Sequence, residues 1–137
     1  MTNNELLRKI NKCNILECTE LVPNKAYLYK KKCKPQIVEN MWCEEEQMII
    51  LVENGVKVGG IYRMGFNDLH WIIKKEFQNQ GILSSFLKLG LINKIWPENK
   101  SVTLCGITST EDYKKKEYLE NLCGMIIKNK LELEKHD

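Results

Sequence analysis

The strongest structural signal in this sequence lies at residues 48–62, MIILVENGVKVGGIY. Two runs rich in aliphatic and β-branched residues flank Asn54-Gly55. This pair is a strong signal for a tight β-hairpin, because both central residues of such a turn need positive φ. Gly59-Gly60 inside the second run predicts a bulge or a close approach of another backbone segment. The stretch therefore predicts an antiparallel hairpin that turns at residues 54–55.

A further strand and a helix follow the hairpin. Residues 65–68 (GFND) predict a turn, and residues 69–75 (LHWIIKK) predict a third strand. After the loop 76–81, apolar residues spaced as on one helix face predict a crossover helix over residues 82–96. Residues 101–108 predict the next strand. Because a strand–helix–strand connection places its strands in parallel, the sheet should be mixed.

The N-terminal third predicts helices and little strand. Thr2-Asn3-Asn4-Glu5 has the form of a capping box, so a first helix of two to three turns should follow. Residues 14–21 favour a short strand. Between residues 25 and 47 the apolar spacing predicts helix on either side of Pro35, because proline breaks or starts a helix.

The C-terminal third completes the predicted order. Ser109-Thr110-Glu111-Asp112 predicts the cap of another helix, Gly124 suits the position just after its end, and a last strand should begin at Met125. The expected fold class is α/β (α+β): a mixed sheet with an antiparallel hairpin, a β-α-β crossover and helices on both faces. No linker or repeat divides the chain, so residues 1–137 should form a single domain.

Composition narrows the classes of protein. The 137 residues carry a net charge of +3 from 21 basic and 18 acidic residues that are interleaved, so a nucleic-acid partner is not favoured. No apolar run approaches the roughly 20 residues that span a bilayer, and residues 1–5 lack the charged and apolar regions of a signal peptide, so a cytoplasmic location is expected. Six cysteines without a C-x-x-C pair, beside two histidines, indicate reduced thiols and no metal site.

The loop at residues 76–85 is the best candidate for chemistry. It joins a strand to a helix, where the first backbone N–H groups lack partners and the helix dipole favours an anion. Gly81 has no Cβ, so a ligand can approach the backbone closely. Gln78-x-x-Gly81-x-Leu83 resembles the pyrophosphate loop of the GNAT acyltransferase superfamily, written Gln/Arg-x-x-Gly-x-Gly/Ala. Leu83 stands where that family has glycine or alanine.

The resemblance extends over the order of elements in residues 48–127, and Leu122-Cys123-Gly124-Met125 looks like the family's closing Leu-x-Gly-Phe segment. It implies acetyl-CoA as the acyl donor, with its pantetheine arm along the end of the strand 69–75. That strand and the strand 102–108 would splay apart to admit the thioester. Simple capping of the following helix is the alternative role of Ser84 and Ser85. The implied cofactor-binding residues are Ile73, Gln78, Gln80, Gly81, Ile82, Leu83, Ser84 and Ser85.

The catalytic residues are less evident. Asp68 and His70, two apart on one strand, share a face and are the candidates for a base, with a satisfied non-catalytic histidine as the alternative for His70. The family's acid tyrosine usually stands four residues before the closing glycine, and that position is Glu120 here. Tyr118 is therefore the candidate acid, with Tyr113 and solvent as alternatives.

The resemblance implies an acetyl-CoA-dependent N-acetyltransferase that acts on an unidentified amine of a small molecule or protein. A GNAT-like domain that binds acyl-CoA or a partner without catalysis is the alternative. Few residues follow Gly124, where the family commonly has another strand. The acceptor side is therefore expected to be open or to be completed by a second copy in a homodimer.

Overall fold

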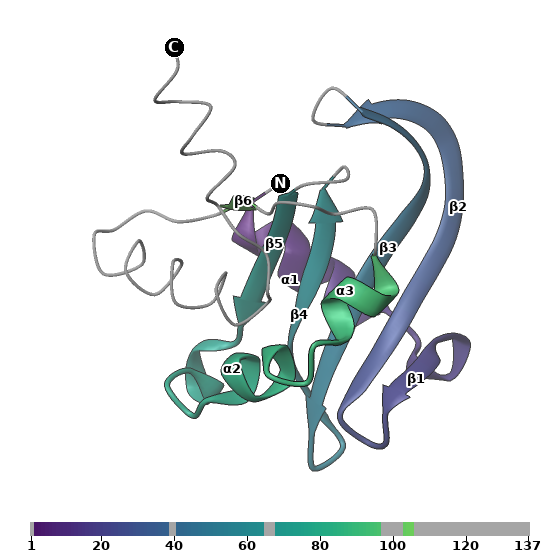
Figure 1. Cartoon of the computed structure of the whole chain (residues 1–137). Helices are drawn as coiled ribbons and strands as arrows, with labels where there is room; N and C mark the ends of the chain where they lie inside the picture. The colour runs from purple at the N-terminus through teal and green to yellow at the C-terminus, as the bar shows by residue number, and fades with distance from the viewer. Residues whose placement is uncertain (1, 39–40, 65–67, 97–102, 106–137) are drawn as a thin grey trace.

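The computed structural model describes residues 2–38, 41–64, 68–96 and 103–105 as a mixed α+β fold (Figure 1). A six-stranded sheet runs in the order β1-β2-β3-β4-β5-β6, with β1 to β5 antiparallel and β6 parallel to β5. The strands are β1 (Thr19–Val22), β2 (Ala26–Val38), β3 (Met41–Glu53), β4 (Val56–Met64), β5 (Asp68–Ile73) and β6 (Thr103–Cys105). The helices are α1 (Asn3–Lys12), α2 (Ile82–Leu87) and α3 (Leu91–Ile95), with 3-10 turns η1 (Ile15–Glu17) and η2 (Lys75–Phe77).

The hairpin of β3 and β4 turns where the sequence predicts. Asn54 has φ 51° and Gly55 has φ 78°, so both central residues occupy the left-handed region that this turn requires. The register places Glu53 opposite Val56 directly beyond the turn. The predicted hairpin at residues 54–55 is confirmed.

Gly59 and Gly60 allow close packing on β4. A Cβ at Gly59 would collide with the backbone oxygen of Ile72 in β5, and one at Gly60 would lie 2.8 Å from the backbone oxygen of Ile49. The ladder to β3 also shifts register next to Gly59, because Leu51 faces Gly59 while Val52 faces Lys57. The bulge and the close backbone approach are both present.

The helices expected on either side of Pro35 are wrong, because residues 26–38 form the long strand β2 and residues 41–53 form the long strand β3. The register places Lys31 opposite Glu46 and Lys32 opposite Glu45, so opposite charges face each other across the ladder. Pro35 lies where the register shifts between Lys32 and Gln36. An irregular segment tolerates a residue without an N–H donor, so proline does not interrupt the strand.

Helix α1 begins as its sequence predicts. The backbone N–H of Glu5 donates to Oγ1 of Thr2 at 3.1 Å, which is half of the expected capping box. The strand expected over residues 14–21 forms only in its last part, as β1, after η1. Among the described helices, none is long and apolar enough to cross a membrane.

The crossover expected as one helix over residues 82–96 is split into α2 and α3. Gly90 has φ 69°, a left-handed conformation that an α-helix cannot contain, and the chain changes direction there. The connection still returns to a parallel strand, since β6 pairs with β5 from Asp68↔Thr103 to His70↔Cys105. The helix and strand expected after residue 108 lie outside the described residues.

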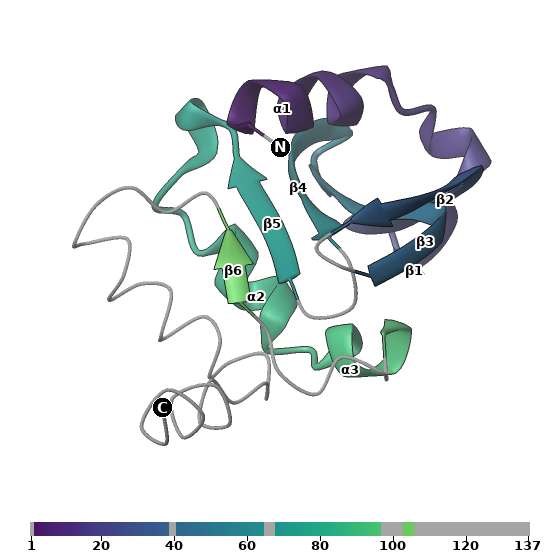
Figure 2. The ribbon, with the colours of Figure 1, turned by 90° about the horizontal axis from the view of Figure 1, so that it is seen from above.

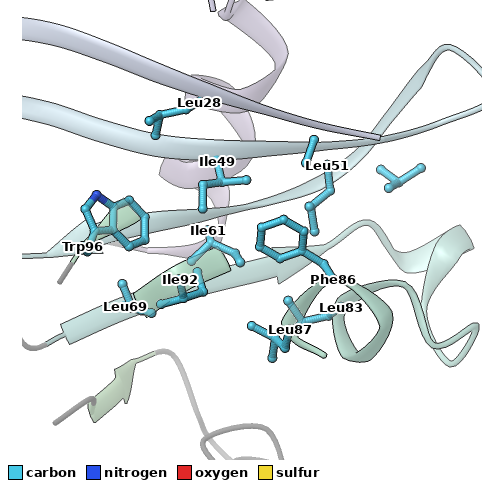
Figure 3. Packing of buried hydrophobic residues seen from close by; sticks show 12 residues of the cluster. Leu28, Ile49, Leu51, Ile61, Leu69, Leu83, Phe86, Leu87, Ile92 and Trp96 are labelled. Atoms are coloured by element: carbon cyan, nitrogen blue, oxygen red, sulfur yellow. The ribbon is translucent and has the colours of Figure 1, made fainter. Parts of the chain in front are cut away.

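Two apolar clusters pack against the sheet. Figure 2 shows the sheet with α1, α2 and α3 beside it. Side chains alternate along β3: Met48, Ile50 and Val52 pack with Leu6 and Ile10 of α1. Ile49 and Leu51 belong to the other cluster, to which α2 and α3 contribute. Figure 3 shows that cluster around Leu28, Ile49, Leu51, Ile61, Leu69, Leu83, Phe86, Leu87, Ile92 and Trp96.

Candidate functional site

The loop between β5 and α2 has a defined conformation. After β5 ends at Ile73, the N–H of Lys74 still bonds to the backbone oxygen of Val58 at 2.8 Å. The turn η2 follows, and the chain then passes through Asn79 with φ 63° and Gly81 with φ 73°. Two left-handed residues within three positions bend the backbone sharply into α2, so the loop is a compact turn between strand and helix.

The two glutamines of the motif hold this turn together. The side-chain Nε2 of Gln78 donates to the backbone oxygen of Ile73 at 3.0 Å. Nε2 of Gln80 donates to the backbone oxygen of Glu76 at 3.3 Å. Each amide therefore satisfies a carbonyl at the start of the loop and leaves the backbone donors at its end unoccupied.

Gly81 presents those donors on an open surface. It is the residue before α2, it makes no side-chain cap, and nothing lies within 4 Å of the position where a Cβ would stand. Within the described part of the chain, the N–H groups of Gly81, Ile82, Leu83 and Ser84 make no backbone hydrogen bond, whereas Ser85 N–H bonds to Gly81 O at 2.9 Å. Successive free N–H groups beside a glycine suit an anionic oxygen ligand.

The side chains that follow Gly81 leave this surface clear. Leu83, which stands where the resembled motif has a small residue, is buried in the cluster of Figure 3. Its side chain therefore does not cover the free N–H groups of the loop. Ser84 is half-buried and Ser85 exposed, and neither caps α2, which has no side-chain cap at all. The capping alternative for the two serines is thus not realised.

The candidate bases lie on β5, before the loop. Asp68 is the first residue of this strand, opposite Met64, and His70 lies opposite Tyr62. The imidazole of His70 is only 1% exposed, and its Nε2 lies 2.8 Å from Oδ1 of Asn3 at the start of α1. Burial lowers the pKa of His70 below its ordinary value, so the ring is neutral near pH 7. The described contact of His70 is a structural one, with α1.

A cavity next to the loop was not foreseen from the sequence. It has a volume of about 350 Å³ and combines the tip of the β3–β4 hairpin with the loop. In an antiparallel meander the start of β4 lies beside the end of β5, so this neighbourhood follows from the strand order. The order of the strands is thus the signal that could have found it. The lining residues are Glu53, Asn54, Val56, Phe77, Gln80 and Ile82.

Two other expected features reach beyond the described residues. Tyr118, the candidate acid, lies outside them, and so do Tyr113 and the closing segment 122–125. The strand expected to splay away from β5 is described only as β6, and its three residues pair with the first half of β5. Trp71, Ile72 and Ile73 have no strand partner on that side among the described residues.

Comparison with protein-family models, with curated proteins and with solved structures found no match. The chemistry of the loop is therefore inferred from its geometry alone. A strand end, an open glycine turn and free N–H groups together can hold an anionic group such as a phosphate.

Proposed function

We propose that this protein is an acetyl-CoA-dependent N-acetyltransferase with a GNAT-like arrangement. The turn Gln78–Ser85 would bind the pyrophosphate of acetyl-CoA, and the pantetheine arm would run past Ile73. The acceptor would be an amine of a small molecule or protein. A cytoplasmic location belongs to the same proposal.

One observation carries the proposal: Gly81 is left-handed and open, and the N–H groups of residues 81–84 lack partners directly after a strand. The order of elements adds support, because an antiparallel hairpin leads into β5 and a crossover returns to the parallel β6. Trp71–Ile73 on the β6 side of β5 would leave room for the thioester arm.

The reaction needs few groups. The amine nitrogen bonds to the thioester carbonyl carbon, the C–S bond breaks, and the sulfur leaves as a thiolate. A base accepts the proton that the amine loses, and an acid or solvent protonates the thiolate. Asp68 and His70 are the proposed bases and Tyr118 the proposed acid. Because Oδ1 of Asn3 lies 2.8 Å from Nε2 of His70, His70 would serve as the base only after that contact opens.

Binding is tested by the melting temperature with acetyl-CoA, CoA and longer acyl-CoAs. A ligand that binds only the folded protein raises the melting temperature by mass action. Gly81→Val should abolish the increase, because a branched side chain would crowd the free N–H groups and resist positive φ. Gly90→Val is the matched control, since Gly90 has φ 69° and open space around it but lies away from the loop. A full increase retained in the folded Gly81→Val protein would count against this site.

Turnover is tested separately from binding. Polyamines, amino acids and peptides are screened for CoA release, and Asp68→Asn, His70→Gln and Tyr118→Phe are compared with the wild type. A residue that serves as the base or acid should lower turnover by about 10²–10⁴-fold while acetyl-CoA affinity stays nearly unchanged. If the three variants turn over as the wild type does, positioning and solvent protons carry the reaction.

A non-catalytic acyl-CoA-binding domain is the second candidate. It is favoured by the contact that buries His70, because a base without access to solvent cannot meet an amine directly. Acetyl-CoA would then raise the melting temperature as strongly, but no amine in the screen would release CoA. The two experiments together distinguish an enzyme, a binding domain and a protein that does not bind CoA.

A further inference from the structure

The strands β2 and β3 continue past the rest of the sheet as a two-stranded arm (Figure 1). On one side, β1 pairs with β2 only as far as Leu28. On the other side, β4 pairs with β3 only from Met48 onward. We define the arm as residues 29–38 and 41–47. Among the described residues, no strand covers either of its edges.

The outer edge of this arm is long enough to hold another strand. At about 3.3 Å per residue, the ten residues 29–38 extend roughly 33 Å. Every second residue of an edge strand directs its backbone N–H and C=O outward, and only Pro35 lacks the donor. Such an edge pairs readily with an extended segment.

The same edge carries concentrated positive charge. Lys30, Lys31, Lys32 and Lys34 are all exposed. Within the described part of the chain, the salt bridges are Lys9–Glu46 and Lys25–Glu53, so none involves these four lysines.

The carboxylates on the neighbouring strand are engaged elsewhere. Glu46 accepts from Lys9 and from the hydroxyl of Tyr62, at 2.8 and 2.9 Å. Glu45 accepts from Nε2 of Gln47 at 2.5 Å, and Glu44 from Nε1 of Trp42 at 3.0 Å. The ammonium groups of the edge are therefore available to an outside acidic group.

An exposed apolar pair adjoins the lysines. Ile37 is 72% exposed and Trp42 59% exposed, and the two lie opposite each other across the ladder near the end of the arm. Lysines alone protect an edge against unwanted pairing. Protection against pairing does not require an exposed isoleucine and an exposed tryptophan. We therefore interpret this exposed apolar pair as a contact site for a partner.

We propose that the outer edge of the arm binds an extended, acidic segment of a partner protein as an added antiparallel or parallel strand. Backbone hydrogen bonds would supply the pairing, the four lysines would select acidic residues, and Ile37 and Trp42 would hold an apolar side chain at the end. Edge-to-edge pairing of two copies is disfavoured, because it would bring the four lysines of one copy close to the four lysines of the other. This surface is separate from the loop at Gly81, so its failure would leave the proposed acetyl transfer untouched.

The probe is a fluorescein-labelled peptide of about ten alternating threonine and glutamate residues, which matches the length of the edge. Fluorescence anisotropy should show binding to the wild type. Lys30→Gln/Lys32→Gln/Lys34→Gln should weaken it by about tenfold, since each exposed charge pair contributes modestly. Lys75→Gln/Lys88→Gln/Lys94→Gln removes the same charge from exposed lysines elsewhere and should change binding by less than about twofold. Thermal melts check that both variants fold.

Two further probes decide between strand addition and simple attraction of charge. A peptide methylated on its backbone nitrogens keeps its charge but cannot donate hydrogen bonds, and it should bind at least about tenfold more weakly. Hydrogen exchange at residues 29–34 should slow only with the unmodified peptide. Equal binding of the methylated peptide, or tighter binding of an oligouridylate of equal charge, would overturn the proposal. Equal weakening by the two lysine triples would overturn it as well.

Discussion

His70 is held in its neutral form by the folded protein. Its ring is buried, and Asn3 offers only the acceptor Oδ1 to Nε2, so Nε2 carries the proton. The other ring nitrogen, Nδ1, is buried without a hydrogen-bond partner. Burial lowers the pKa of His70 from its ordinary 6.5, so the folded protein resists protonation of this ring.

This shift predicts a pH dependence of stability. Below the unfolded pKa of 6.5, the unfolded chain binds a proton at His70 that the folded protein does not bind, so the free energy of unfolding falls as the pH is lowered. The contribution is complete above pH 6.5 and is lost towards the lower folded pKa. Urea denaturation near neutral and near mildly acidic pH should show a larger loss for the wild type than for His70→Gln. Equal losses would mean that the ring titrates alike in both states.

Lys57, which lies on β4, donates hydrogen bonds to backbone oxygens at the C-terminal end of α1. Its ammonium donates to the backbone oxygens of Ile10 at 2.9 Å, Asn11 at 3.2 Å and Cys13, at the end of the helix where carbonyls lack intrahelical partners. The oxygen of Ile10 also accepts from the N–H of Cys13 at 3.2 Å. A cation at a helix C-terminus also interacts favourably with the helix dipole. No local sequence pattern announces this contact, since more than 40 residues separate Lys57 from the helix.

Lys57→Met should therefore lower the free energy of unfolding by about 1–2 kcal/mol, since it removes charge-assisted hydrogen bonds at the end of α1. Lys12→Met is the matched control, because Lys12 lies exposed in the last turn of the same helix. Its loss should stay below about 0.5 kcal/mol. Urea denaturation measures both, and similar values for the two variants would show that the bonds of Lys57 are not important for stability.

At the scale of elements, the close packing of β4 against β5 depends on Gly59. A Cβ there would strike the backbone oxygen of Ile72, which cannot move without breaking the ladder. Gly59→Ala should cost at least about 2 kcal/mol of stability. Gly55→Asn should cost less than about 1 kcal/mol, because its surroundings are open and asparagine tolerates positive φ. Thermal denaturation with the reverse order of losses would contradict this account.

The elements that could be predicted are those with local signals. The turn of the hairpin depends on two adjacent residues, Asn54 and Gly55. The cap of α1 depends on a hydrogen bond from the N–H of Glu5 to Thr2, only three positions away. The strands β2 and β3 could not be recognised this way, because their charged runs are matched only across the ladder. Gly90 interrupts an apolar spacing that continues on both sides, so periodicity alone could not detect the break.

The candidate site also has one part that local sequence predicts and other parts that depend on contacts between distant residues. The turn at Gly81 could be predicted from the sequence, because the residues that determine its conformation are contiguous. The cavity beside it needs Asn54 from the hairpin, and the burial of His70 needs Asn3, which is 67 residues away. Contacts of this length depend on the order of strands and on which face each helix covers, so they follow only once the fold is known.

At the scale of the whole molecule, β3 contributes buried side chains to both apolar clusters. Along β3, Ile50 faces α1 while Ile49 and Leu51 face the cluster of α2 and α3. Loss of packing on the α1 side must therefore loosen the strand that supports the other side. We expect the described sheet and its helices to unfold in a single transition, even when only one cluster is weakened.

Ile10→Ala tests this coupling. Ile10 is fully buried in the α1 cluster, so the substitution should cost about 2–5 kcal/mol. Trp71 and Trp96 both pack with the opposite cluster. In a Trp42→Phe background, which removes the exposed tryptophan, fluorescence reports that side alone. If the cores are coupled through β3, the fluorescence midpoint and the circular dichroism midpoint in urea should fall together. A fluorescence midpoint that stays at the Trp42→Phe value while the helical signal falls earlier would show that the two faces unfold independently.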